Sequence, residues 1–219
     1  PCSGSLMSIA ESSSLLVIAC GALAREIEWL RRNNDWQSVS VKCLDAELHN
    51  RPEKIPEKLD AVIAENHDQF DQIFVAYGDC GTGGGIDKVL ARWNLERLPG
   101  AHCYAFYATE ARFDALADAE PGTFYLTDFL VRHFDRLVVR GLKLDRHPQL
   151  LQEFFGHYRR VVYLAQQDDE QLQLAARRAA DYLGLRFETL TTGMGELGQH
   201  LERQVINLQH ASGAHHAAH

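Results

Sequence analysis

Short apolar segments rich in β-forming residues alternate with segments of helical spacing along most of this chain of 219 residues. Residues 15–19 are typical of a buried strand, and apolar side chains recur at helical spacing in residues 23–32. The alternation continues to a last expected helix at residues 195–208. Because such alternation is typical of a parallel sheet with helices on both faces, the sequence predicts an α/β fold. We expect a single doubly wound domain of the Rossmann-like or flavodoxin-like kind, with a mostly parallel sheet.

The same periodicities place the other elements. The other expected strands are residues 38–44, 72–77, 97–102, 160–166 and 186–190. The other expected helices are residues 57–65, 86–93, 104–116, 129–139, 148–155 and 168–183. No repeat or low-complexity linker divides the chain, so we expect residues 15–208 to form one domain. Residues 1–14 are expected to be a disordered leader or an added remnant, and residues 209–219 a flexible tail rich in His and Ala.

The charge balance excludes several classes of partner. The formal net charge is −8, from 22 Lys and Arg against 30 Asp and Glu. Phosphate affinity comes mainly from Lys and Arg, so this balance argues against nucleic acid and anionic membranes. The apolar run at residues 15–24 is far shorter than the roughly 20 residues that span a bilayer. We therefore expect a cytoplasmic protein with a small-molecule substrate, whose cysteines are thiols, nucleophiles or metal ligands rather than disulfides.

Three cysteines stand where expected strands end, namely Cys20, Cys80 and Cys103. Because the strands of a parallel sheet point the same way, these thiols should meet at one carboxyl edge, where open α/β sheets bind ligands. A following helix N-terminus also favours the thiolate, which is both the nucleophile and the metal-binding form. The alternative for each cysteine is a buried core side chain, and this is the role expected for Cys43, inside a strand.

His49 follows the second expected strand and can reach the same edge. Cys20, Cys80, Cys103 and His49 would complete a tetrahedral zinc site, or leave one position open if only three of them bind. Thiolate ligands favour zinc, or less readily an iron–sulfur cluster, over magnesium or calcium. Asp79, next to Cys80, is the expected catalytic base or a partner that supports a ligand.

A glycine-rich turn follows Asp79 and precedes an expected helix. It contains Cys80 and then Gly81, Thr82, Gly83, Gly84 and Gly85. Glycines at such a turn let backbone N–H groups approach an anion, so these residues are candidates for binding a cofactor. The turn resembles the D-x-G-x-G-x-G turn of S-adenosylmethionine-dependent methyltransferases, although here it follows the third expected strand instead of the first. The alternative is a turn that only allows a strand and a helix to pack closely.

Several short motifs occur in order along the chain: residues 19–23 (ACGAL), 48–50 (LHN), 77–82 (YGDCGT), 102–104 (HCY) and 126–128 (LTD). Through them the chain resembles the domain-of-unknown-function family 1638 over about residues 15–208. Members of that family are often encountered beside components of corrinoid-dependent methyltransferases. The resemblance therefore implies one-carbon or thiol metabolism, with corrinoid or methyltransferase proteins as partners, by association alone.

Four functions follow from these residues. The first is a metal-binding α/β protein, with zinc held by Cys20, Cys80, Cys103 and His49, that acts on a small molecule in one-carbon, thiol or corrinoid-linked methyl-transfer metabolism. The second is a metal or cofactor carrier, or an assembly partner, without turnover. The third is a metal-free cysteine nucleophile at Cys80, with His49 or His102 as its base. The fourth is an S-adenosylmethionine-dependent methyltransferase.

Overall fold

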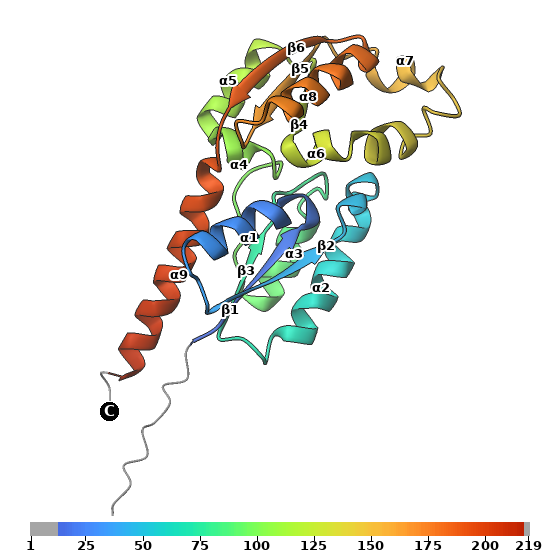
Figure 1. Cartoon of the computed structure of the whole chain (residues 1–219). Helices are drawn as coiled ribbons and strands as arrows, with labels where there is room; N and C mark the ends of the chain where they lie inside the picture. The colour runs from blue at the N-terminus through green and yellow to red at the C-terminus, as the bar shows by residue number, and fades with distance from the viewer. Residues whose placement is uncertain (1–12, 217–219) are drawn as a thin grey trace, which may run out of the picture.

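The computed structural model describes residues 13–216, and the side chains of residues 13–210. Six parallel strands divide into two three-stranded sheets, which lie one above the other in Figure 1. The expected α/β class and the parallel strands are confirmed. Most of the expected leader lies outside the described residues; its last residue, Ser14, bonds through its backbone N–H and hydroxyl to the carboxylate of Asp71.

The first sheet has the order β2-β1-β3. Its strands are β1 (Leu15–Cys20), β2 (Val39–Leu44) and β3 (Gln72–Ala76). The helices between and after them are η1 (Gly21–Leu23), α1 (Ala24–Asn33), η2 (Ala46–Asn50), η3 (Pro52–Lys54), α2 (Ile55–Asn66) and α3 (Gly85–Trp93). Every residue of the central strand β1 is buried, because helices and loops cover both faces. We call this part of the chain the first unit.

The second sheet has the order β4-β5-β6. Its strands are β4 (Thr123–Thr127), β5 (Arg160–Ala165) and β6 (Arg186–Thr191). The accompanying helices are α4 (Ala105–Ala108), α5 (Glu110–Ala119), α6 (Asp128–Arg132), the π-helix η4 (Asp135–Arg140), α7 (Leu150–Phe155) and α8 (Glu170–Leu183). The central strand β5 is again buried at every residue. We call this part the second unit.

The last helix, α9 (Gly195–His216), brings the end of the chain back to the first unit. In Figure 1 it runs from the second sheet down along the side of the first. Leu197, Leu201 and Val205 belong to the same hydrophobic core as β1, and Gln72 Nε2 donates to Gln204 Oε1 at 2.9 Å. The helix continues past residue 208, where the sequence predicted its end. Residues 217–219 of the expected tail lie outside the described residues.

Several elements differ from the sequence-based expectation. The expected strand at residues 97–102 is reduced to a single bridge between Val75 and Arg97. Pro99 follows, and Gly100 has a φ of 102°, so the backbone cannot continue an extended ladder. The first sheet therefore ends at β3 within the described residues. The strands of the second unit form their own sheet.

Two expected helices are interrupted, and one strand was missed. The helix expected at residues 104–116 breaks at Thr109, whose φ is 64° and whose hydroxyl caps α5. The helix expected at residues 129–139 is α6 followed by the π-helix η4. The missed strand is β4, whose sequence TFYLT consists of residues with high β-propensity. Thr127 ends that strand and also caps α6, as expected for a helix start.

Candidate metal centre

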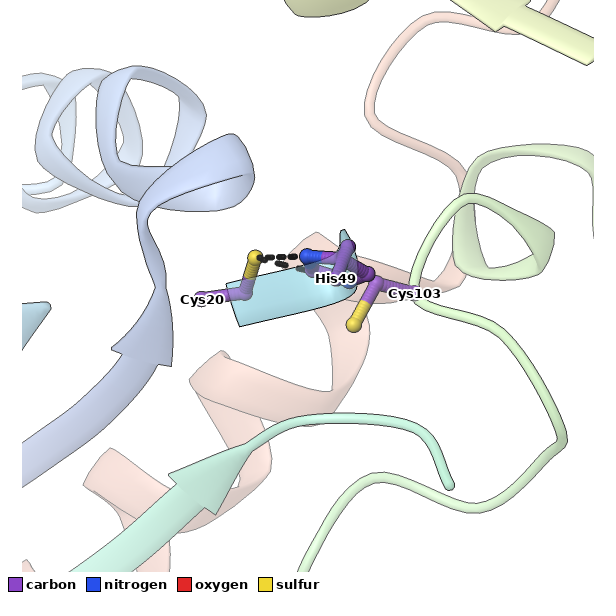
Figure 2. A group of neighbouring side chains, drawn as sticks. All are labelled: Cys20, His49 and Cys103. Atoms are coloured by element: carbon purple, nitrogen blue, oxygen red, sulfur yellow. Dashed lines mark hydrogen bonds between the residues drawn. The ribbon is translucent and has the colours of Figure 1, made fainter. Parts of the chain in front are cut away.

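The thiols expected at the carboxyl edge of the first sheet lie close together. Cys20 is the last residue of β1, Cys80 and Cys103 lie in the loops that follow β3, and His49 lies in η2 after β2. Figure 2 shows the side chains of Cys20, His49 and Cys103 converging from three separate segments. One ligand atom from each of these three residues lies within 4.8 Å of the other two. The expected convergence is therefore present in the structure.

The spacing of these atoms suits a single metal ion. With Zn–S bonds of about 2.3 Å and Zn–N bonds of about 2.0 Å, the ligand atoms of a tetrahedral site lie roughly 3.5–3.8 Å apart. The Cys20 Sγ lies 3.8 Å from His49 Nδ1 and 3.9 Å from His49 Nε2. Cys80 Sγ and Cys103 Sγ are only 3.0 Å apart. Both could bind one ion only after separating by about 0.8 Å.

His49 is oriented in a way that metal-binding histidines share. Its Nδ1 lies 3.0 Å from the carbonyl oxygen of Ala46, in the same η2 turn. When Nδ1–H donates to that oxygen, Nε2 carries the free lone pair and becomes the ligand atom. The ring also stacks on Tyr77, with centroids 6.3 Å apart. A backbone acceptor and an aromatic neighbour thus hold the imidazole beside Cys20, whose sulfur is almost equally far from both ring nitrogens.

Backbone N–H groups hold two of the sulfurs. Ala22 N–H donates to Cys20 Sγ at 3.3 Å, so Cys20 caps the helix η1. Gly78 N–H donates to Cys103 Sγ at 3.3 Å. A Cβ on Gly78 would lie 2.9 Å from the carbonyl carbon of His102, so only glycine allows these two segments to approach so closely. The positions of the sulfurs are therefore built into the backbone.

The electrostatics of the cluster favour two thiolates and one imidazolium when no metal is bound. A hydrogen bond from the Cys103 thiol lowers the pKa of both Cys20 and Cys80 to about 5, against the effect of burial and with help from His49. Burial alone would lower the pKa of His49, but the Cys20 and Cys80 thiolates raise it to about 11. Donation to Cys20 and Cys80, together with burial, keeps Cys103 protonated and raises its pKa.

Cys80 has an uncommon backbone conformation. Its φ is 49°, in the left-handed region, and its N–H donates to the Ala101 carbonyl at 2.7 Å. Residues other than glycine seldom adopt this region, and such strain gathers at functional sites. The conformation places the Cys80 sulfur beside that of Cys103. Cys80 therefore joins the cluster, although it is outside the group of three atoms within 4.8 Å of one another.

Asp79 is bound into the glycine-rich turn. Its carboxylate accepts hydrogen bonds from the Thr82 hydroxyl at 2.8 Å, Gly83 N–H at 3.1 Å and Gly84 N–H at 2.8 Å. These bonds lower the pKa of Asp79, that from Gly84 most. They favour a structural role for Asp79 over that of a base. They also engage two amides that an anionic cofactor would need. Binding of a cofactor by Gly81, Thr82, Gly83, Gly84 and Gly85 stays a prediction.

A cavity of about 320 Å³ adjoins the cluster, between the two units. His49 and Cys103 form part of its wall on the side of the first unit, and residues of β4, α6, η4 and α7 form the opposite side. His49 keeps accessible surface at this cavity although protein atoms surround the ring. Asp79 and the glycine-rich turn are not among the described residues that line it. A ligand in the cavity would thus lie beside two of the three metal-ligand candidates.

A family model described as "Protein of unknown function (DUF1638)" matches residues 43–201 of the chain. The chain belongs to this family. The match confirms the resemblance drawn from the short motifs and brings no activity with it. The chain matched no curated protein and no solved structure. Among residues 13–216, no helix has both the length and the apolar character needed to cross a membrane. The cytoplasmic location stays a prediction.

Other cysteine and histidine expectations had mixed outcomes. The prediction of a core role for Cys43 is wrong: the side chain is exposed, because β2 is an edge strand with one open face. His102 stacks on Tyr104, with centroids 4.9 Å apart, and is not one of the three clustered ligand candidates. Cys20, Cys43, Cys80 and Cys103 are all free thiols, as expected of non-disulfide cysteines.

The sequence reasoning missed Tyr77 and the residues of the cavity wall. Tyr77 is fully buried behind the thiols, and burial together with the nearby thiolates raises its pKa. It stands directly before Gly78 in the YGDCGT motif, so that motif was the available signal. No sequence signal indicated the cavity wall, because its residues come from segments far apart in the chain.

Proposed function

We propose that this chain is a metal-binding protein in which Cys20, Cys103 and His49 Nε2 hold one zinc ion, and that it acts on a small molecule bound in the adjoining cavity. The observation that carries the proposal is the convergence of these three ligand atoms within 4.8 Å of one another. Cys80, whose sulfur lies 3.0 Å from that of Cys103, is the candidate fourth ligand.

The types of ligand atom indicate which metal the site favours. Thiolate and imidazole ligands suit zinc, whereas magnesium and calcium require oxygen ligands. The depressed pKa of Cys20 favours its thiolate, the form that binds a metal. The carbonyl partner of His49 Nδ1 leaves Nε2 as the ligand atom, and metal binding displaces the proton that the thiolates otherwise hold on the ring. An iron–sulfur cluster is a weaker candidate, because such clusters are usually held by four cysteines.

Three protein ligands would leave a fourth position for a substrate or water. Zinc in such a site acts as a Lewis acid, or lowers the pKa of a bound thiol or water. His49 and Cys103 both line the cavity, so a bound molecule would lie next to that position. This arrangement supports a transferase or hydrolase, and it would suit the thiol or corrinoid-linked methyl-transfer chemistry that the family resemblance suggests.

The competing function is a carrier or assembly protein. If Cys80 also binds, the four ligands close the site, as in structural zinc centres. The two arrangements differ in the role of Cys80 alone, so one variant separates them.

The experiment is elemental analysis of purified protein in which the four histidines of the C-terminal segment, His210, His215, His216 and His219, are replaced by alanine. We expect about one zinc ion per chain. Cys20→Ser, Cys103→Ser and His49→Gln should each lower zinc affinity about tenfold or more. Cys43→Ser is the matched control, since Cys43 is an exposed thiol outside the cluster, and should keep the full metal content.

Cys80→Ser distinguishes the enzyme from the carrier. Retention of zinc would indicate a three-ligand site with an open position, and loss would indicate a closed four-ligand site. A wild-type protein that contains no zinc after growth and reconstitution with zinc would contradict the proposal. In that case stoichiometric alkylation at Cys80 would support the metal-free nucleophile instead.

A further inference from the structure

The cavity between the two units has a wall of unusual composition for this chain. Nineteen residues line it, and seven of them are aromatic, although aromatic residues make up only 9 % of the sequence. The seven are Tyr104, Tyr107, Phe124, Tyr125, Phe129, Phe155 and Tyr158. Aromatic walls favour an aromatic guest, because rings gain from offset-stacked and edge-to-face contacts beyond the apolar area they bury.

Several rings of the wall already contact each other in stacked or edge-to-face arrangements, and the ring of a ligand could make the same kinds of contact. Tyr104 and Tyr125 stack with centroids 5.6 Å apart and an angle of 22° between their planes. Phe124 meets Phe155 edge to face at 5.3 Å. Because these side chains brace one another, the wall keeps its shape without a ligand, and little ordering is needed on binding.

The wall carries almost no charge. No Asp, Glu, Lys or Arg is among the described residues that line the cavity, while such residues make up 24 % of the chain. A zinc ion held by two thiolates and a neutral imidazole has no net charge, and a third thiolate would make the centre negative. The centre therefore offers no net positive charge to offset the burial of an anion. A cation would find no carboxylate on the wall.

Polar groups on the wall differ between its two ends. On the second unit, the Thr123 hydroxyl donates to the Glu120 carbonyl and the Thr127 hydroxyl caps α6, while the Tyr125 hydroxyl is buried without a hydrogen-bond partner among the described residues. His49 and Cys103 lie at the opposite end, on the first unit. A ligand would thus be apolar over most of its length and polar where it meets the metal centre.

We infer that the cavity binds an uncharged aromatic molecule that carries one hydroxyl or thiol, with its ring among the aromatic side chains and its polar group against His49 and Cys103. The inference rests on the proposed function for the metal contact only. A cavity of about 150 Å³ holds benzene, so about 320 Å³ accommodates a substituted ring or a fused pair. Two members of this class, benzyl alcohol and benzyl mercaptan, distinguish the hydroxyl from the thiol.

The test is calorimetry on the full chain, with zinc and without it. Toluene, benzyl alcohol and benzyl mercaptan are the neutral probes, phenylacetate is the anionic probe, and benzyltrimethylammonium is the cationic probe. We expect the neutral probes to bind at least tenfold more tightly than either charged probe. Zinc should strengthen the binding of benzyl alcohol or benzyl mercaptan and leave toluene unchanged. Equal or tighter binding of a charged probe would overturn the inference.

A blocking variant shows whether the probes enter this cavity. Leu137 lies in η4, is half-buried and lines the cavity, so Leu137→Trp should weaken toluene binding at least tenfold. Leu151→Trp is the matched control, because Leu151 is a half-buried leucine packed on the same core but is not among the cavity residues. Leu142→Trp, on the same wall as Leu137, is the second blocking variant if the first does not fold.

The two proposals fail in different ways. Toluene binding that Leu137→Trp abolishes, in a protein that takes up no zinc on reconstitution, would contradict the metal centre and support the cavity. Zinc at one ion per chain together with no binding of any neutral probe would support the metal centre and overturn the cavity inference. Toluene binding that Leu137→Trp and Leu142→Trp leave unchanged would also overturn it.

Discussion

The two units are built alike, yet they contribute different things. Each has three parallel strands with a fully buried central strand, β1 or β5. At the carboxyl end of the first sheet, thiols and an imidazole face one another, and Cys103 and His49 also line the cavity. At the corresponding end of the second, polar groups bind each other: Asp128 Oδ1 accepts from the Tyr163 hydroxyl at 2.7 Å and from Gln166 N–H at 3.0 Å. The first unit thus presents reactive groups, and the second presents aromatic walls.

This difference shows that two units of the same architecture can contribute different parts of one site. Parallel sheets leave polar groups at their carboxyl ends, and these groups can bind ligands or satisfy each other. Where they bond to each other, as Asp128 Oδ1 does with Tyr163 and Gln166, the unit contributes shape. Where they remain directed at a common point, as around Cys20, it contributes chemistry. The predictions below test whether the two units are separable in this way, from the largest expected effect to the smallest.

The largest effect should come from the two central strands. Ile18 in β1 and Leu164 in β5 are both fully buried, so replacing either by alanine should cost about 2–5 kcal/mol of unfolding free energy. We expect one unfolding transition by chemical denaturation, because the adjacent residues Tyr107 and Ala108 of α4 pack into the cores of the first and second unit respectively. Two transitions, each moved by only one variant, would mean that the units unfold independently.

The next effect is confined to the second unit. Arg160 is buried and donates to the Thr123 hydroxyl, the Leu116 carbonyl and the Glu188 carboxylate, at 2.8, 2.9 and 2.9 Å. Arg160→Met should therefore lower stability by about 2–3 kcal/mol. Arg186→Met is the control, since Arg186 is exposed and its ion pair with Glu120 is 4.0 Å long, and should cost under about 1 kcal/mol. Zinc content should not change in either variant, and its loss in Arg160→Met would show that the metal centre depends on the second unit.

A pH effect should be confined to the first unit in metal-free protein. The lowered pKa of Cys20 means that its thiolate stabilises the fold fully above about pH 9, and that this contribution is lost as pH falls through about 5. The raised pKa of His49 stabilises the fold fully below about pH 6.5, and that contribution is lost as pH rises through about 11.

Denaturation at a series of pH values should therefore show stability that rises from about pH 5 to about pH 9 and falls above it, because Cys20 and Cys80 together outweigh the opposite effect of His49. Cys20→Ser should flatten the acid side of the curve. Cys43→Ser should leave the curve unchanged, because Cys43 lies outside the cluster. An identical acid limb in wild type and Cys20→Ser would refute the assignment of this titration to the cluster.

The smallest effect concerns the contact between the units. Arg136 in η4 and Glu47 in η2 form an ion pair of 2.7 Å across them, and both side chains are about half exposed. Arg136→Ala should cost no more than about 0.5 kcal/mol at low salt, with the difference disappearing at high salt. Arg140→Ala is the control within the second unit, where Arg140 pairs with Asp135. A cost of several kcal/mol for Arg136→Ala alone would show that this contact holds the units together.

Much of the fold was predictable because it depends on local patterns. The apolar run in β1, the helical spacing of α8 and the glycine that ends α8, Gly184, are all visible in the sequence. The division into two sheets was not predictable, because the alternation of strands and helices indicates that strands exist but not which strands pair. Pro99 and Gly100, which end the first sheet, are also present in the sequence, but they lie inside the strand expected at residues 97–102.

The candidate site was predictable in its members more than in its geometry. Cys20 reaches the carboxyl edge for the expected reason, since it ends a strand in a parallel sheet. Cys103 reaches the same edge for another reason, because it lies in a loop that does not directly follow a strand. Two hydrogen bonds hold this loop: Gly78 N–H donates to Cys103 Sγ, and Cys80 N–H donates to the Ala101 carbonyl. The proximity of Cys80 to Cys103 follows from the left-handed backbone conformation of Cys80, which no sequence pattern predicted.

The sequence by itself determined the α/β class, the strand end that carries Cys20 and the placement of Cys80 and His49 in loops at the same edge, because burial periodicity and strand direction are local properties. Only the tertiary structure decided which sulfurs meet, which backbone oxygen His49 contacts and where an aromatic cavity opens. Those outcomes depend on residues far apart in the chain, such as His49 and Phe155, which line the same cavity, and proximity at that range leaves no periodic trace in the order of amino acids.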